Sequence, residues 1–146
     1  MKPPEQVRLE LVRQWLGKAE EDFAVAQHLA AAQVLFYGAA GFHAQQAAEK
    51  FIKALLVRFQ VEFPKTHDLD QLIDLVATID NGLSDSLRNA ASLTPYAVEV
   101  RYPSESPQLT LDDAKAAVLL AAHVRKVVLA QLEDYLQSGE TEPQTP

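Results

Sequence analysis

The stretch from Gly41 to Leu56, GFHAQQAAEKFIKALL, combines an apolar helical face with side chains that can bind ions or transfer protons. At about 100° per residue, its alanines fall on one broad face with Phe51, Ile52 and Leu55. Polar residues line the two edges of this face; one edge carries His43, Gln46, Lys50 and Lys53, and the other carries Gln45 and Glu49. An imidazole can transfer protons near pH 7, and an ammonium group can hold an anion. Two interpretations stay open: the solvated side of an amphipathic helix, or part of a binding site.

The four histidines do not form a metal motif. His28, His43, His67 and His123 lie on separate predicted elements, and no pair has HxxxH or HExxH spacing. His67 in KTHD falls at a predicted helix start, where it and Lys65 can hold an anion beside free backbone N–H groups. Local capping is the alternative role for this segment. We therefore expect no metal and no cofactor, and the absence of cysteine and of a GxSxG motif excludes thiol and serine-hydrolase chemistry of those kinds.

Two charged residues occupy or flank positions where the helical pattern calls for apolar side chains. Arg125 takes one step of the apolar 3-4 spacing in the last predicted helix, and Asp22 flanks the apolar stripe of the first. Arg125 either extends its guanidinium to water along the surface of the core or forms a partly buried ion pair with an acid such as Asp22 or Glu99. Neither interpretation assigns a catalytic role to Asp22 and Arg125.

Composition limits the class of protein. The chain has 146 residues, of which 48% are apolar, and this fits one globular domain. Its net charge of −7, from thirteen basic and twenty acidic residues, disfavours an extended nucleic-acid surface. The longest apolar-looking run, residues 116–124, is too short to span a bilayer, and the charged N-terminus does not resemble a signal peptide. We expect a cytoplasmic protein with no membrane contact.

The periodicity predicts helices throughout and no strand. Asp68 with Gln71 has the spacing of a capping box, and Thr110 with Asp113 opens the last helix. Residues 101–109 form a predicted loop because their two prolines cannot continue a helix. The expected helices have these approximate bounds: 5–32, 37–60, 68 to a stop at Asn81-Gly82, 83–97, and 110 to Ser138-Gly139.

Short connections between long helices predict an all-α fold, a five-helix antiparallel up-and-down bundle. We expect a single domain over residues 1–139, followed by a disordered tail over 140–146, which is short, polar and proline-containing. The last helix also carries Leu119, Leu120 and Val127 away from its main apolar stripe. Apolar side chains off the main stripe indicate a central helix or an oligomer contact, and they favour a homodimer.

Four segments, in this order along the chain, resemble the HEPN family. They are KAEEDFAVAQ from Lys18, FHAQQAAEKFIKALL from Phe42, PKTHDLDQLI from Pro64, and RYP from Arg101. The resemblance extends over roughly residues 15–136. It implies a small five-helix antiparallel bundle that commonly dimerises, with a fold similar to the helical domain of kanamycin nucleotidyltransferase.

The same resemblance implies a function. Many prokaryotic HEPN proteins look like partners of a minimal nucleotidyltransferase, a pair often interpreted as toxin and antitoxin. Another branch consists of metal-independent ribonucleases that use an Arg followed four to six residues later by His. The sequence departs from that motif, because YPSESPQL follows Arg101 and no other arginine has a histidine at that spacing. We therefore do not expect ribonuclease activity by that mechanism.

Given the resemblance, we expect the edge formed by His43, Gln46 and Lys50 to face a cleft shared with Arg101 and Tyr102. There Tyr102 could stack on a base, while Arg101 and Lys50 hold phosphate. The alternative is structural: Arg101 anchors the loop to an acid and Tyr102 plugs the end of the bundle. The leading expectation is a non-enzymatic module that binds a nucleotide, a partner minimal nucleotidyltransferase, or both. A purely structural homodimer and a ribonuclease toxin with an atypical site are the alternatives.

Overall fold

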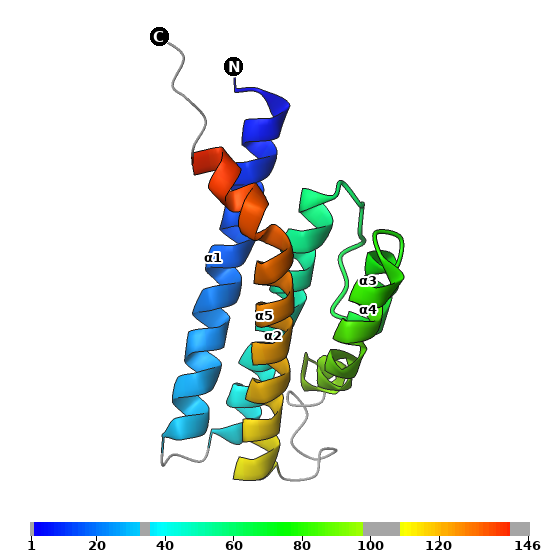
Figure 1. Ribbon diagram of the computed structural model, residues 1–146. Helices are drawn as coiled ribbons and strands as arrows, with labels where there is room; N and C mark the ends of the chain where they lie inside the picture. Colours follow the sequence, from blue (N-terminus) through cyan, green and yellow to red (C-terminus); the bar gives the residue numbers. More distant parts are fainter. Residues whose placement is uncertain (1, 33–35, 98–108, 141–146) are drawn as a thin grey trace.

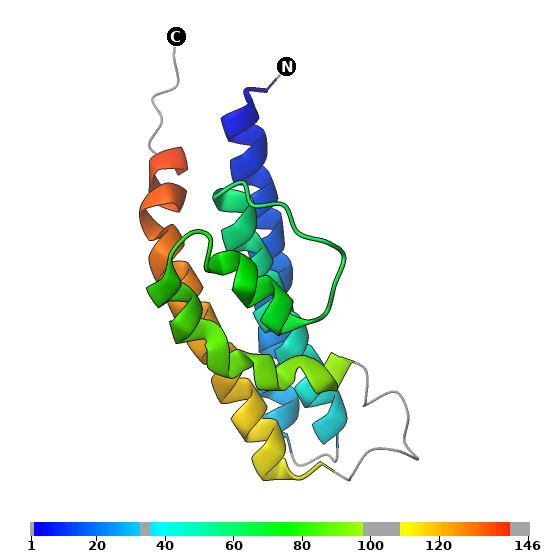
Figure 2. The ribbon, with the colours of Figure 1, turned by 90° about the vertical axis from the view of Figure 1, so that its right-hand side faces the viewer.

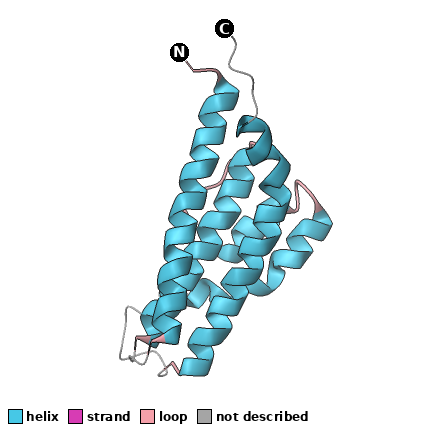
Figure 3. Cartoon of the chain, turned by 60° about the vertical axis from the view of Figure 1, so that its left-hand side comes forward, coloured by secondary structure: helices cyan, strands magenta, loops and turns pink. Residues whose placement is uncertain are grey.

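The computed structural model describes residues 2–32, 36–97 and 109–140, with side chains described as far as Ser138. All regular structure in these residues is helical, as Figure 3 shows, and the predicted all-α class is confirmed. Within the same residues, no helix is long and apolar enough to cross a membrane. The elements are α1 (Pro4–Ala31), α2 (Tyr37–Arg58), α3 (Leu69–Val76), α4 (Asn81–Leu87), the 3₁₀ helix η1 (Arg88–Ala97) and α5 (Leu111–Glu140).

Three long helices form the body of the bundle. α1 runs antiparallel to both α2 and α5, which run in the same direction as each other (Figure 1). The short elements α3, α4 and η1 cover the side of α2 and α5 that faces away from α1 (Figures 1 and 2). α2 is therefore the central helix, and it is in contact with α1, α5, α3 and η1.

Small side chains bring α1 and α2 close together. Ala19 and Ala26 of α1 and Ala44 and Ala47 of α2 are all completely buried. Alanine side chains let two helix backbones approach closely without leaving a void, so the contact between α1 and α2 is closely packed. Larger side chains continue the buried face of α2 toward its C-terminal end, where Phe51, Ile52, Leu55 and Leu56 are completely buried.

Two helix starts match the predicted caps. The side chain of Asp68 accepts a hydrogen bond from the backbone N–H of Asp70 at the start of α3. At the start of α5, the backbone N–H of Asp113 donates to the Thr110 hydroxyl oxygen, and the Asp113 carboxylate accepts from the backbone N–H of Thr110. The last helix continues to Glu140, just beyond its predicted end.

The region after α3 differs from prediction. Asn81-Gly82 was expected to end the third helix, but α3 ends at Val76 and Asn81 is the first residue of α4. The reason is a cap: the Asp80 side chain accepts from the backbone N–H of Leu83 and starts a new helix. The predicted helix 83–97 is an α-helix only to Leu87. The remainder is η1, whose sequence RNAASLTPYA contains residues that disfavour the α-helix.

Several predictions fall outside the described residues. These include almost all of the loop 101–109, with Arg101 and Tyr102, and residues 141–146 of the predicted disordered tail. The α5 residues on which the homodimer prediction rests lie within the described part of the chain. Leu119 is 70% exposed, while Leu120 and Val127 are partly buried. The homodimer itself stays a prediction.

Candidate functional site

One edge of the α1–α2 contact carries a group of charged side chains that we call the seam cluster: Asp22, His43 and Lys50. The Nδ1 atom of His43 lies 2.9 Å from Oδ1 of Asp22, and the Lys50 ammonium donates to the other carboxylate oxygen at 2.5 Å. The sequence placed His43 and Lys50 on one helix edge, and Asp22 of the antiparallel α1 holds both of them. The side chains of Asp22, His43 and Lys50 are 14%, 31% and 23% exposed, so the cluster reaches the surface.

The seam cluster retains unused hydrogen-bond donors. The ammonium group of Lys50 has three N–H bonds, and its one hydrogen bond to a described residue goes to Asp22. The Nε2 atom of His43 also makes no hydrogen bond to any described residue; it accepts in the neutral imidazole, whose Nδ1–H donates to Asp22, and donates in the imidazolium. Because Asp22 compensates one positive charge, the cluster is neutral with a neutral imidazole and carries a charge of +1 with an imidazolium. Its geometry suits two roles, holding an anion and carrying a proton on Nε2.

Gln46 connects the seam edge to the interior. It lies on α2 between His43 and Lys50, about one turn from each. Its side-chain amide donates to the Gln45 side-chain oxygen at 2.7 Å, and the Gln45 amide donates to the backbone oxygen of His67 at 3.2 Å. Gln46 therefore lies on the helix edge next to the seam cluster, while its amide hydrogen bond goes to Gln45, which in turn contacts the segment that precedes α3.

A second row of polar side chains on α2 is buried. Gln45, Glu49 and Lys53, spaced four residues apart, are 0%, 2% and 7% exposed. For these residues the interpretation as a solvated helix side is wrong, because Trp15 of α1 and the segment with Phe63 and His67 lie against them. The Lys53 ammonium lies 3.8 Å from the Glu49 carboxylate and sits over the rings of Trp15 and Phe63, 5.5 and 5.6 Å from their centres. The attraction between the cation and the ring faces compensates part of the cost of burying this lysine.

His67 and Lys65, the other candidates for anion binding, lie apart from the seam cluster. The Nδ1 atom of His67 is 2.7 Å from the buried carboxylate of Glu49, although the imidazole is 59% exposed. His67 thus fastens the segment before α3 to α2, and this supports its local structural role. Lys65 is exposed and forms no hydrogen bond or ion pair with a described residue. Arg101 and Tyr102, which were expected to complete the cleft, lie outside the described ranges.

The predicted ion pair between Asp22 and Arg125 does not form. Nε of Arg125 donates to the carboxylate of Glu20 at 2.7 Å, and the guanidinium lies over the Phe23 ring, 5.6 Å from its centre. Glu20 and Asp22 are two residues apart, about 200° around α1, so only one of them can face α5. Arg125 and Glu20 are each 40% exposed, so this pair belongs to the surface and contributes little to stability.

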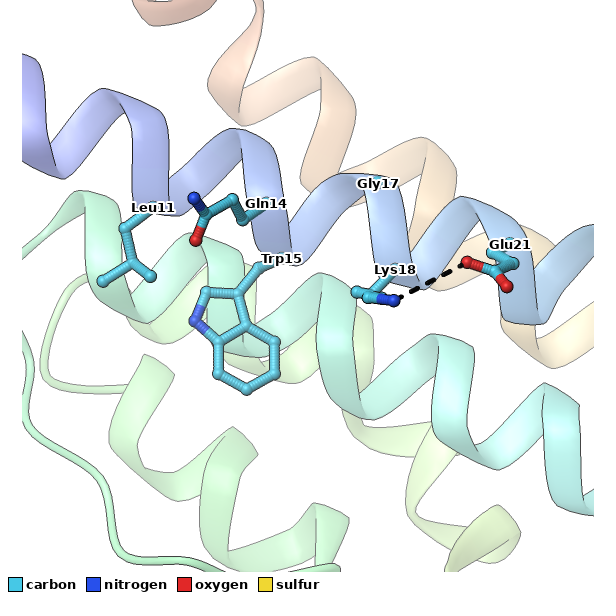
Figure 4. A pocket seen from close by; sticks show the side chains of 6 residues that line it. All are labelled: Leu11, Gln14, Trp15, Gly17, Lys18 and Glu21. Carbon is cyan, nitrogen blue, oxygen red and sulfur yellow. Dashed lines mark ion pairs between the residues drawn. The ribbon is translucent and has the colours of Figure 1, made fainter.

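A concave surface of about 490 Å³ lies on α1 beside the seam, and the sequence did not single it out. We call it the α1 concavity. Figure 4 shows the Trp15 ring directed toward α2 and Lys18 extended toward Glu21, 4.0 Å away. The residues that line it are Leu11, Gln14, Trp15, Gly17, Lys18 and Glu21. The available signal was Gly17, a helix-destabilising residue in the middle of a long helical pattern. Among the described residues, no three histidine or carboxylate side chains converge as metal ligands would.

Comparisons with known proteins agree with this all-helical architecture. The family model described as the HEPN domain matches residues 12–132, and the chain belongs to the HEPN family. Among solved structures, the chain is similar to TT1696 from Thermus thermophilus, with 28% identity and a TM-score of 0.69. The match covers 83% of this chain and 98% of that one. The comparison with curated proteins finds no match. The predicted HEPN membership is thus confirmed.

Proposed function

We propose that this HEPN protein is a non-enzymatic module that binds the phosphate groups of a nucleotide at the seam cluster. The observation that carries the proposal is the pair of nitrogen groups held by Asp22. Lys50 and His43 sit together at the surface. The Lys50 ammonium retains N–H groups that can donate to a phosphate oxygen, and Nε2 of His43 adds a further donor in the imidazolium form. Because Asp22 already orders these two side chains, binding costs less conformational entropy than it would with free surface side chains.

The charge of the protein favours a confined site over a general one. A net charge of −7 repels polyphosphates and nucleic acids from most of the surface. The missing Arg-to-His spacing supports binding without catalysis. Arg101 and Tyr102 remain candidates for the same site, with Arg101 on phosphate and Tyr102 on the base.

Calorimetric titration with ATP, GTP and a short RNA tests the phosphate site. The wild type is compared with Lys50→Gln, and the matched control is Lys115→Gln, which removes an exposed lysine from α5. We expect Lys50→Gln to weaken nucleotide binding by roughly 10- to 150-fold, the equivalent of one lost charge-assisted hydrogen bond, while the control has little effect. The absence of binding at millimolar nucleotide, or equal effects of the two substitutions, would contradict the proposal. Arg101→Ala extends the same assay to the RYP motif.

The second part of the proposal is that the module works beside a minimal nucleotidyltransferase, as a homodimer. The family membership supports a partner of this class, and the exposed Leu119 on α5 supports self-association. We expect affinity purification from the native cell, followed by mass spectrometry, to recover a small nucleotidyltransferase. Sedimentation should give a dimer that Leu119→Lys weakens. Recovery of no such enzyme, or a monomeric wild type, would remove the corresponding part of the proposal.

RNA cleavage is a second candidate function, and one observation favours it. Asp22 holds Nδ1 of His43 and leaves Nε2 open, which is how a carboxylate orients a histidine that acts as a general base. Incubation with labelled RNA in the presence of a chelator tests this function. Cleavage that disappears in His43→Ala and persists in His28→Ala, an exposed histidine of α1, would establish it; intact RNA would exclude it.

A further inference from the structure

The α1 concavity and the seam cluster follow the same edge of α1. Trp15, Lys18 and Asp22 are spaced by three and four residues, so their side chains leave the helix on one side. Trp15 and Asp22 are separated by seven residues, or about 10 Å along the helix axis. On α2, Lys53 lies under Trp15 and Lys50 binds Asp22, so the two helices keep this edge aligned. A ligand that lies along the edge can contact the concavity and the seam cluster together.

Gly17 leaves the backbone of α1 open to solvent at the concavity. A Cβ atom added at Gly17 would have no neighbour within 4 Å, so no described part of the chain requires glycine here. In the interior of a 28-residue helix, glycine costs about 1 kcal/mol relative to alanine. The missing side chain leaves open space beside Gln14. The amide of Gln14 makes no hydrogen bond to a described residue and offers both a donor and an acceptor.

Trp15 is held in place as one wall of this space. Its ring packs edge-on against Phe63, with 6.2 Å between ring centres, and the Lys53 ammonium lies 5.5 Å from its centre. Lys18 sits between Trp15 and the seam cluster. Its ion pair with Glu21 is 4.0 Å long, and both side chains are more than 70% exposed, so Lys18 can be redirected at little cost.

We infer that the α1 concavity binds the base of the nucleotide whose phosphates lie at the seam cluster. This inference rests on the proposed function and makes it more specific: the ligand is a nucleoside di- or triphosphate, since a monophosphate is too short to contact both places. The base packs on Trp15 with its polar edge toward Gln14. Lys18 binds the first phosphate, and Lys50 with His43 binds the outer ones. The flat apolar wall, the free amide and the line of cations match a base, its polar edge and its phosphates in that order.

The protein carries its own reporter, because Trp15 is its one tryptophan. Tryptophan fluorescence, excited at the red edge of the indole band to limit absorption by the nucleotide, is followed during titration with ATP and with inorganic tripolyphosphate. We expect ATP to quench Trp15 and to bind roughly 5- to 150-fold more tightly than tripolyphosphate, as one stacked base contributes. Tripolyphosphate should bind with little change in fluorescence.

Gly17→Leu fills the concavity with a side chain that favours the helix, so the variant should fold. Its matched control is Ala24→Leu, which adds the same side chain to the exposed side of α1 two turns away. We expect Gly17→Leu to lower the affinity for ATP to that for tripolyphosphate, and Ala24→Leu to leave it unchanged. Sedimentation of both variants shows whether either substitution alters self-association.

The outcomes separate the inference from the proposed function. If ATP and tripolyphosphate bind equally, depend on Lys50 and leave Trp15 unquenched, the base site is wrong and the phosphate site stands. If neither ligand binds, both are wrong. If Gly17→Leu changes the oligomeric state but not the affinity for ATP, the concavity belongs to a second copy of the chain, and the inference is overturned.

Discussion

Two glycines in the long helices provide a test of how the bundle is packed. Gly17 on α1 faces open space, whereas a Cβ atom at Gly41 on α2 would lie 2.6 Å from Cε1 and 3.0 Å from Cγ of Tyr96, and closer still to Cδ1. Both glycines have helical backbones with negative φ. Alanine can therefore adopt either conformation, and only the surroundings of the two positions differ.

The expected free energies follow from these distances. Gly17→Ala should stabilise the fold by about 0.5–1 kcal/mol, because alanine favours the helix and the methyl group meets nothing. Gly41→Ala gains the same helix propensity, but the Tyr96 ring must move by about 1 Å to restore an ordinary carbon–carbon separation. Such overpacking costs about 1–3 kcal/mol. Since the propensity gains cancel, the two variants should differ in stability by that packing cost, with Gly41→Ala the less stable.

Urea unfolding followed by circular dichroism measures both free energies of unfolding. For a chain of this length, each kcal/mol also shifts the melting temperature by about 4 °C, so thermal melts provide an independent reading. Tyr96→Ala is the control background: without the ring, Gly41→Ala should lose its penalty relative to Gly17→Ala. If Gly41→Ala were as stable as Gly17→Ala in the wild-type background, Tyr96 could not be packed against α2 as described.

Two further predictions concern charged groups. Glu49→Ala should destabilise the protein by about 3–5 kcal/mol in urea unfolding, because Lys53 stays buried without its carboxylate. The double variant with Lys53→Met should be more stable than Glu49→Ala alone, and equal stabilities would show that the lysine carries no penalty. Hydrogen bonds from the backbone N–H and the hydroxyl of Thr110 hold the pKa of Asp113 below its ordinary value of 3.8. The stability advantage of the wild type over Asp113→Asn should therefore be present above that pH and disappear as the pH falls through the lowered pKa. Melting temperatures of both proteins across the acid range test this, and a constant difference would refute it.

The helical periodicity of the sequence was sufficient to predict the long elements. Apolar positions three and four residues apart define α1, α2 and α5 almost to the residue, because each helix buries one continuous stripe. The same rule placed His43, Gln46 and Lys50 on one edge of α2. Helix capping by Asp68 and Thr110 could also be predicted from the sequence, since it depends on residues close together in the chain.

The periodicity of the sequence did not predict which side chains from different helices contact one another. A helical wheel gives the direction of Asp22, but not which helix lies in that direction, so Asp22 was named as a candidate partner of Arg125, whose carboxylate partner is Glu20. Glu49 and Lys53 fall at the margins of the apolar face, and they are buried only because the segment with Phe63 and His67 folds over them. The α1 concavity contains a position without a side chain, Gly17. Composition and helical periodicity do not show that such a position lies in a concave surface.

The shared direction of α2 and α5 has an electrostatic consequence. The peptide dipoles of both helices place their negative poles at the same end of the bundle. Two arginines lie near these C-terminal helix ends. Arg58 is the last residue of α2 and stacks on Tyr135, with its guanidinium 4.1 Å from the ring centre, and Arg13 donates to the backbone oxygen of Leu136 at 3.3 Å. Arg13 is thus committed to a carbonyl group of α5 and Arg58 to an aromatic ring, and an anionic ligand is better accommodated along the flank of the helices than at their tips.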